Sequence, residues 1–226
     1  MQAPTNRGGA KTLMSLRCAA LAGMAAPMVF VSVFSLEGWL RPGYQPAGMF
    51  VSELSLGPRG WVQIASFLLT GGLILIFARA LAVSRLGGSR VGPILLGLIG
   101  VSLMASGPFR TDPSALFTQV STHGLIHGLF GAVVFSLAPA TCLVYFRHFR
   151  RGPAWQALTG WTLAAGLVLV VGIMVLKLSQ QPGSQMYAWK GLIQRLVLVT
   201  FMAWLFAFAA RLLHSLNAEQ ASATLL

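Results

Sequence analysis

Long apolar runs separated by short polar segments form the main pattern along the 226-residue chain. A helix rises 1.5 Å per residue, so about 20 residues cross the ~30 Å hydrocarbon core of a membrane. Only helices and closed barrels satisfy their backbone in lipid, and these runs are too long and too uniformly apolar for barrel strands. The pattern therefore predicts an all-α, polytopic integral membrane protein with six transmembrane helices in one bundle. The predicted spans are 13–36, 61–83, 91–107, 122–146, 154–178 and 190–214.

The connections between the runs are short, except for 37–60 and 108–121. No internal repeat or second domain is visible, so we expect a single membrane domain over 1–226, with 217–226 as a flexible cytoplasmic tail. The first run follows basic residues, as in a signal peptide. Its apolar stretch continues for a full span, however, and this predicts a retained first helix.

Composition supports lipid as the solvent of this chain. Hydrophobic residues make up 56% and charged residues 9%, whereas soluble domains carry about a quarter charged residues. The net charge of +12 comes from basic residues that stand singly or in short clusters at the ends of apolar runs. That distribution is typical of the cytoplasmic face of a membrane protein, so we expect membrane lipids and no nucleic acid as partners.

The positions of Lys and Arg predict the orientation. Ten of the 16 basic residues lie on the side of the N-terminus and six on the other side. Positive residues concentrate in the cytoplasm, which predicts an inner (cell) membrane protein with both termini cytoplasmic. The outer side then gathers three carboxylates and two histidines, namely Glu37, Glu53, Asp112, His123 and His127.

The segment STHGLIHGLFG, 121–131, combines histidines with glycines at the start of the fourth run. His123 and His127 are four residues apart and share one helix face, which we expect to point into the bundle because polar groups facing lipid are costly. Gly124 and Gly128 form a small-xxx-small pattern that Gly131 extends. This pattern predicts a close helix contact, within the bundle or between copies in a homo-oligomer.

Two histidines at this spacing can bind one divalent metal such as zinc if a third ligand is added, and Asp112 is the candidate. In metalloprotease helices a glutamate follows the first histidine, but here Gly124 takes that place, so that chemistry is not supported. Two other interpretations stay open. The histidines can hydrogen-bond neighbouring loops, or they can form a proton-handling or substrate-binding site.

Arg195 lies about 7 Å deeper in the sixth run than Lys190. Its guanidinium either extends outward to the interface or pairs with a carboxylate, for which Glu53 and Asp112 are the candidates; such a pair would be a structural contact or part of a site for an anionic headgroup. The apolar segment MFVSELSL, 49–56, predicts a short element with Ser52 and Glu53 turned toward the bundle. Asp112 stands before a proline and also suits a role as a cap for backbone amides.

Three signals together carry a family resemblance: SELS at 52–55, GPFRTDP at 107–113 and His123 at the start of the fourth run. In these motifs and in its six spans the chain resembles the bacterial and archaeal membrane family called domain of unknown function 998, from Met28 to His214. That family is similar in layout to membrane proteins of the Frag1/DRAM/Sfk1 type. The resemblance implies a role related to lipids and the candidate positions Ser52, Glu53, Asp112 and His123, but no reaction. His127 rests on spacing alone.

The sequence favours a protein that binds a lipid or small ligand at its outer polar cluster. The candidate ligand-binding residues are Ser52, Arg110, Lys190 and Arg195.

Two alternatives remain. In a lipid-modifying enzyme, a metal on His123, His127 and Asp112 would activate water, with the carboxylate of Glu53 as the base and Arg195 holding a phosphate. The candidate catalytic residues are then Glu53, His123 and His127. In a proton-coupled carrier, His127 and Glu53 would relay protons. The few polar residues at mid-depth and the lack of a repeat speak against that carrier.

Overall fold

The computed structural model describes residues 7–84, 88–114, 120–181 and 183–224, and every regular element in these ranges is helical. The α-helices are α1 (Arg7–Leu40), α2 (Gly60–Ser84), α3 (Val91–Ala105), α4 (Thr122–Phe149), α5 (Thr159–Ser179) and α6 (Lys190–Thr224). Three short 3-10 helices precede α2, α5 and α6, namely η1 (Val51–Ser55), η2 (Pro153–Leu158) and η3 (Gln185–Trp189). The predicted all-α class is confirmed.

Five helical segments are long and apolar enough to cross a membrane: Leu13–Leu40, Gly60–Ser84, Thr122–Phe149, Pro153–Ser179 and Gln185–Ala218. The prediction of six spans is therefore confirmed for five. The third run forms α3, which has 15 residues and so is only about 22 Å long. It ends at Ala105 and not at 107, because Pro108 follows closely and a helix rarely continues through the residue before a proline.

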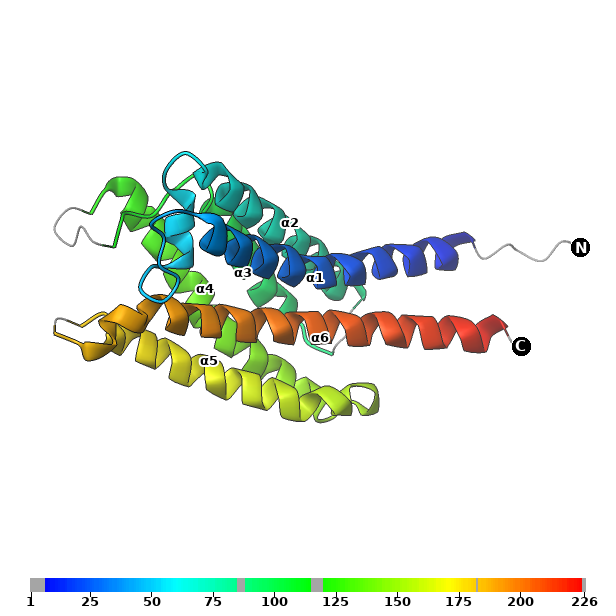
Figure 1. Ribbon diagram of the computed structural model, residues 1–226. Helices are drawn as coiled ribbons and strands as arrows, with labels where there is room; N and C mark the ends of the chain where they lie inside the picture. Colours follow the sequence, from blue (N-terminus) through cyan, green and yellow to red (C-terminus); the bar gives the residue numbers. More distant parts are fainter. Residues whose placement is uncertain (1–6, 85–87, 115–119, 182, 225–226) are drawn as a thin grey trace, which may run out of the picture.

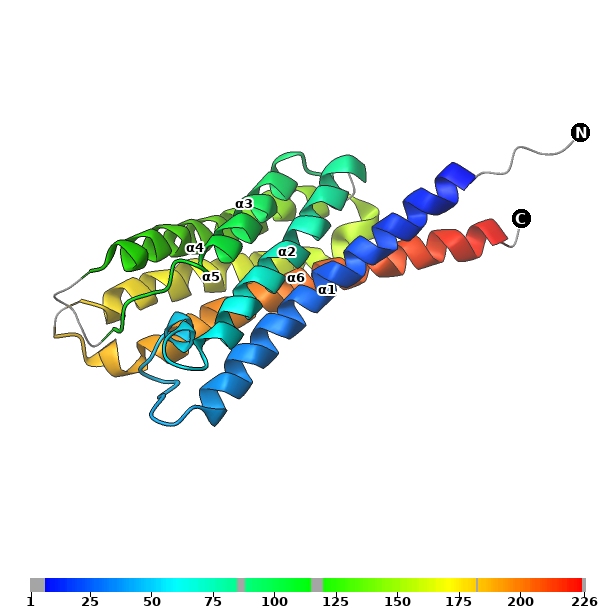
Figure 2. The same cartoon turned by 90° about the horizontal axis from the view of Figure 1, so that it is seen from above.

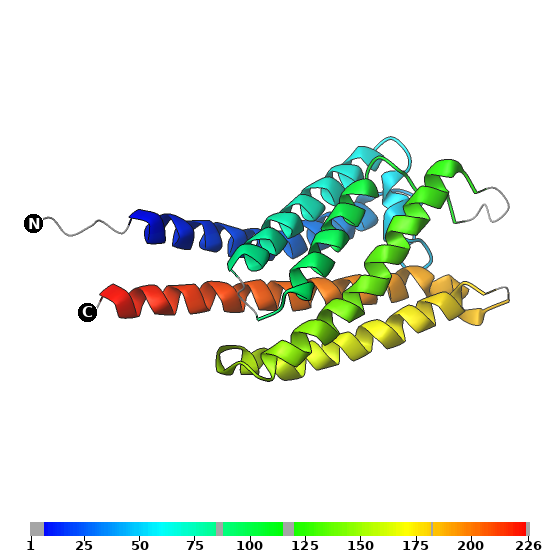
Figure 3. The ribbon, with the colours of Figure 1, turned by 180° about the vertical axis from the view of Figure 1, so that it is seen from behind.

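The six α-helices form a ring in which each packs against the next and α6 returns to α1 (Figures 1 and 2). Neighbouring helices run in opposite directions, so the N- and C-termini lie at the same end of the ring, called here the terminal end. The opposite end carries η1 and is called the η1 end. Helices α4 and α5 are closest at the terminal end and diverge toward the η1 end (Figure 3).

Small residues and aromatic rings hold the ring together. A Cβ on Gly71 of α2 would lie 2.4 Å from the carbonyl oxygen of Gly100, so these two glycines let α2 and α3 approach closely. Close approach of this kind drives helix association in lipid, where apolar burial itself gains little. At the terminal end, buried aromatic rings fill the interior, and the centroids of Tyr145 and Phe208 lie 4.7 Å apart.

Two segments differ from their predicted form. The segment from 217, expected to be a flexible tail, is helical as far as Thr224. There Nε of Arg17 on α1 donates to Oδ1 of Asn217 at 3.0 Å, which ties the end of α6 to α1. Helix α1 also continues past its predicted end at 36 to Leu40, so Glu37 lies in the last turn of a helix and not in a loop.

Candidate functional site

The short helix η1 closes the η1 end of the ring, where it packs against α1, α2 and α6. Its residues Val51, Leu54 and Ser55 are buried. A Cβ on Gly60 would lie only 2.1 Å from the carbonyl oxygen of Ser55, so the start of α2 packs directly on η1. The expected short element with Ser52 and Glu53 facing the helices is therefore present as this inserted 3-10 helix.

The carboxylate of Glu53 holds η1 through backbone amides. Oε1 accepts a hydrogen bond from the amide of Phe50 at 2.8 Å, and Oε2 accepts one from the amide of Ser114 at 3.1 Å. The first contact closes the start of η1, and the second joins η1 to the connection between α3 and α4. Both oxygens are thus engaged in holding the fold, and Glu53 is only 3% exposed.

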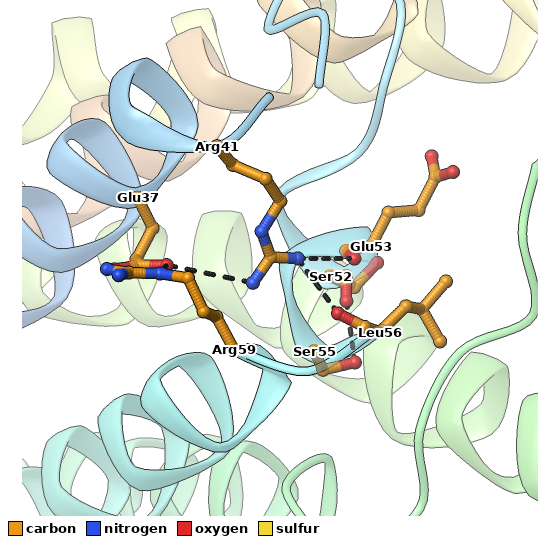
Figure 4. Close-up of polar contacts among 7 residues, drawn as sticks. All are labelled: Glu37, Arg41, Ser52, Glu53, Ser55, Leu56 and Arg59. Atoms are coloured by element: carbon orange, nitrogen blue, oxygen red, sulfur yellow. Dashed lines mark hydrogen bonds and ion pairs between the residues drawn. The ribbon is translucent and has the colours of Figure 1, made fainter. Parts of the chain in front are cut away.

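A second set of contacts fixes the other side of η1 (Figure 4). Nη1 of Arg41 donates to the carbonyl oxygen of Leu56 at 2.9 Å. Glu37 lies 3.6 Å from Nη2 of Arg41 and also forms an ion pair with Arg59. In Figure 4 the Glu53 carboxylate points away from Arg41, so the two acidic residues hold η1 from different sides.

Arg195 has neither of the carboxylate partners expected from the sequence. Its Nη1 donates to the carbonyl oxygens of Pro46 at 2.5 Å, Met49 at 2.9 Å and Gly191 at 3.0 Å, and its Nη2 donates to the hydroxyl of Tyr44. The prediction of Glu53 or Asp112 as the partner is wrong, because the 44–50 loop folds over α6 and presents backbone carbonyls to the guanidinium. Burial raises the pKa of Tyr44 against the opposing effect of Arg195.

Asp112 caps the start of α4 together with Ser121. Its carboxylate accepts from the amide of Ser121 at 2.8 Å and from the hydroxyl at 2.7 Å, and the Ser121 hydroxyl accepts from the amide of Gly124 at 3.0 Å. These donors hold the pKa of Asp112 below its ordinary value, because they favour the charged form. The interpretation of Asp112 as a cap therefore agrees with the geometry.

The position of the Asp112 carboxylate explains why residue 124 of the glycine pattern is a glycine. A Cβ on Gly124 would lie 1.9 Å from Oδ2 of Asp112, so Gly124 makes room for the capping carboxylate. A Cβ on Gly128 or Gly131 would meet no described atom within 4 Å. The predicted close helix contact is wrong within the chain, because the α3–α4 connection folds back onto Gly124. A contact of Gly128 with a second copy stays a prediction.

The two histidines share one helix face, and both lie near Phe109. Nδ1 of His127 is 2.8 Å from the Phe109 carbonyl oxygen, and the His123 ring centroid is 5.7 Å from that of Phe109. Only His127 is buried, while His123 is exposed. Within the described ranges, no three His, Cys, Asp or Glu side chains are grouped so that they could hold a metal ion. The zinc site on His123, His127 and Asp112 stays a prediction, and the positions of these three side chains do not support it.

Inside the ring, beneath η1, lies a cavity of about 50 Å³. Its polar lining residues come from four elements: Ser52 of η1, Ser106 at the end of α3, His127 of α4 and Gln194 of α6. The apolar wall is formed mainly by Phe30, Val51, Phe67, Leu103, Gly131, Val134, Phe135 and Leu198. No charged side chain is among the residues that line it. A space of this size admits water or one small polar group of a larger molecule.

Of the four predicted ligand-binding residues, only Ser52 lines this cavity. Lys190 is buried away from it, with its Nζ 3.5 Å from the centroid of the Tyr187 ring and 5.6 Å from that of Phe50. Arg110 is exposed. Sequence reasoning did not select Ser106 or Gln194 as site residues. For Gln194 a signal existed: an amide inside an apolar run, whose Oε1 accepts from the amide of Val51 at 2.8 Å.

A family model described as "Protein of unknown function (DUF998)" matches residues 24–211. The chain belongs to the DUF998 family. The matched range includes η1 and every residue that lines the cavity, so the candidate site of this DUF998 protein lies within the part that defines the family. No curated protein and no solved structure matches the chain.

Proposed function

We propose that this DUF998 protein binds an amphipathic ligand, a membrane lipid or a related small molecule, whose polar part enters the cavity beneath η1. The observation that carries the proposal is the convergence of Ser52, His127 and Gln194 from three separate elements on one apolar-walled space. Ligand sites in proteins typically have this composition, with mostly apolar walls and a few polar groups that fix orientation.

The polar groups favour an uncharged, hydroxyl-bearing guest. A carbonyl only accepts, so Nδ1 of His127 carries the proton in the contact with Phe109; in the uncharged form of the imidazole, Nε2 is then an acceptor. Oε1 of Gln194 is engaged by Val51, and its amide N–H groups are the donors that remain. Ser52 supplies a hydroxyl that can donate or accept. A charged group would lose its hydration here without a counter-charge, at a high cost.

The charge distribution supports a location for this site. The excess of Lys and Arg on the N-terminal side favours cytoplasmic termini in a cell membrane. The η1 end would then face outward, and the ligand would come from the outer leaflet.

The enzyme and carrier alternatives receive less support. Both oxygens of Glu53 accept backbone hydrogen bonds, so its carboxylate is poorly placed to act as a general base or as a proton relay. Beyond the cavity, toward the terminal end, the interior contains closely packed aromatic rings such as those of Trp204 and Phe208. Binding without turnover or transport is therefore the function that the geometry favours.

The proposal is tested with two matched glycine variants of α4. Gly131 lines the cavity and Gly128 does not, yet a Cβ at either position meets no described atom within 4 Å. Gly131→Leu should fill the cavity, while Gly128→Leu adds the same side chain outside it. The wild type and both variants would be purified in mild detergent, and their co-purified small molecules identified by mass spectrometry.

We expect one molecule to be retained by the wild type and by Gly128→Leu and to be lost from Gly131→Leu. Size-exclusion chromatography and thermal melting would show that both variants fold. The same co-purified molecules in equal amounts in all three proteins would contradict binding in the cavity.

A further inference from the structure

The outer surface of the ring contains a second, larger hollow at the terminal end. We propose that a groove between α4 and α5 binds one acyl chain of an anionic phospholipid, whose phosphate is held by Arg147, Arg150 and Arg151. This site is separate from the cavity beneath η1. It lies nearer the terminal end of α4, and none of its lining residues lines that cavity; its other wall is formed by α5, which does not contribute to the cavity.

The groove has a volume of about 390 Å³, and its walls are almost entirely apolar. On α4 it is lined by Pro139, Ala140 and Phe146, and on α5 by Gly166 and Leu167, among others. The small residues on both walls leave this space between two helices in contact. A side chain at Gly166 would project toward α4, because its Cβ would lie 3.3 Å from that of Cys142.

The groove begins about one leaflet's depth from the end of α4. It extends from Pro139 to Phe146, near the end of α4 at Phe149. The seven residue steps from Pro139 to Phe146 rise about 10 Å, and the ten steps from Pro139 to the end of α4 at Phe149 rise about 15 Å, which is half of the ~30 Å hydrocarbon core. An acyl chain lying in the groove would thus have its headgroup at the turn between α4 and η2.

The arginines at that turn are connected to the groove by a direct contact. The guanidinium carbon of Arg150 lies 5.9 Å from the ring centroid of Phe146, and Phe146 lines the groove. Arg147, Arg150 and Arg151 are exposed, and none of them forms an ion pair with a residue that the structure describes. Guanidinium groups bind phosphate through paired hydrogen bonds. Charge complementarity therefore favours an anionic lipid over a zwitterionic one.

The test uses native mass spectrometry of the full-length protein released from vesicles that contain equal amounts of phosphatidylglycerol and phosphatidylcholine. Gly166→Leu should fill the groove. Gly160→Leu is the matched control on the same helix, because Gly160 is exposed, lies outside the groove, and has open space around a built Cβ. We expect Gly166→Leu to lower the retained phosphatidylglycerol about tenfold and Gly160→Leu to leave it unchanged.

The headgroup is tested separately. Replacing Arg147, Arg150 and Arg151 by Gln should remove the preference for phosphatidylglycerol, because each basic residue near a membrane surface contributes about 1 kcal/mol of attraction, roughly fivefold. Retention of phosphatidylcholine should not change. Ala140→Leu fills the groove from the α4 side and replaces Gly166→Leu if that variant does not fold.

Equal retention of phosphatidylglycerol by the two glycine variants would overturn the proposal, as would equal retention of both lipids by the wild type. A dimer that is lost in Gly166→Leu would also overturn it, because the groove would then bind a second copy. Gly131→Leu should leave phosphatidylglycerol retention unchanged, which separates this test from that of the cavity beneath η1.

Discussion

Arg195 of α6 donates a hydrogen bond to the hydroxyl of Tyr44, and this hydroxyl donates in turn to the carbonyl oxygen of Phe50 at 2.9 Å. The two side chains thereby connect the sixth helix to the residue that precedes η1. The same guanidinium reaches the carbonyl oxygen of Met49 at 2.9 Å. A cation inside an apolar run is thus satisfied by a folded loop and not by a carboxylate.

The first prediction concerns this connection. Arg195→Ala should lower the free energy of unfolding by about 2 kcal/mol, because it removes hydrogen bonds from a charged donor to the partly buried carbonyl oxygens of Met49 and Gly191. Arg195→Lys should have an intermediate effect, since an ammonium cannot reach as many acceptors in one plane. Thermal melting in detergent measures both changes. Arg110→Ala is the control, because Arg110 is exposed at the same end of the molecule. An equal melting temperature for Arg195→Ala and Arg110→Ala would contradict the assignment.

A second prediction separates two glycines of α4. Gly128→Ala should be neutral or stabilise the helix by up to ~1 kcal/mol, because a Cβ there meets open space. Gly124→Ala should destabilise the protein, because the new Cβ would displace the carboxylate of Asp112 from its cap. Melting temperatures of the two variants in the same detergent test this difference. If Gly128→Ala were the more harmful change, Gly128 and not Gly124 would make the close contact.

The third prediction is a pH dependence from Asp112. Its pKa is lowered by hydrogen bonds from Ser121, so ionisation of the carboxylate stabilises the folded state. This contribution is fully present above the unfolded-state pKa of about 4 and is lost as the pH falls through the lower folded-state value. The melting temperature of the wild type should therefore exceed that of Asp112→Asn at neutral pH, and the two should converge in acid. A difference that stays constant down to low pH would rule out this linkage.

The fourth prediction concerns Glu53. Glu53→Gln should cost about 2–3 kcal/mol, because a glutamine has one acceptor oxygen where the fold requires two, for the amides of Phe50 and Ser114. Ser52→Ala, one residue away, should leave the melting temperature unchanged and lower only the retention of the co-purified ligand. A stable Glu53→Gln protein would show that its carboxylate does not hold η1 in place.

The sequence predicts the fold well, because apolar runs of this length have few alternatives in lipid. The main difference between the predicted and the observed fold is α3, whose predicted span runs to 107 while the helix ends at Ala105, before Ser106 and Gly107. The helix that continues to Thr224 contacts Arg17, near the other end of the chain, and no local sequence pattern encodes such a contact.

The site is predicted less completely. Ser52 and His127 are found by motif and spacing and both line the cavity. The partners of Arg195 could not be predicted, because backbone carbonyls have no signature in the sequence. The role of Gly124 depends on the return of Asp112 over the start of α4, which a helix-packing pattern does not reveal.

Binding beneath η1 is tested most directly by a crystal structure of the wild type grown in a lipid mesophase prepared with lipids from its own membrane. We expect density that the chain does not account for in the cavity, within hydrogen-bonding distance of Ser52, His127 and Gln194. A cavity filled by the rings of Phe30 and Phe135, with the Ser52 hydroxyl, Nε2 of His127 and the amide nitrogen of Gln194 all bonded to the chain itself, would contradict the proposed function.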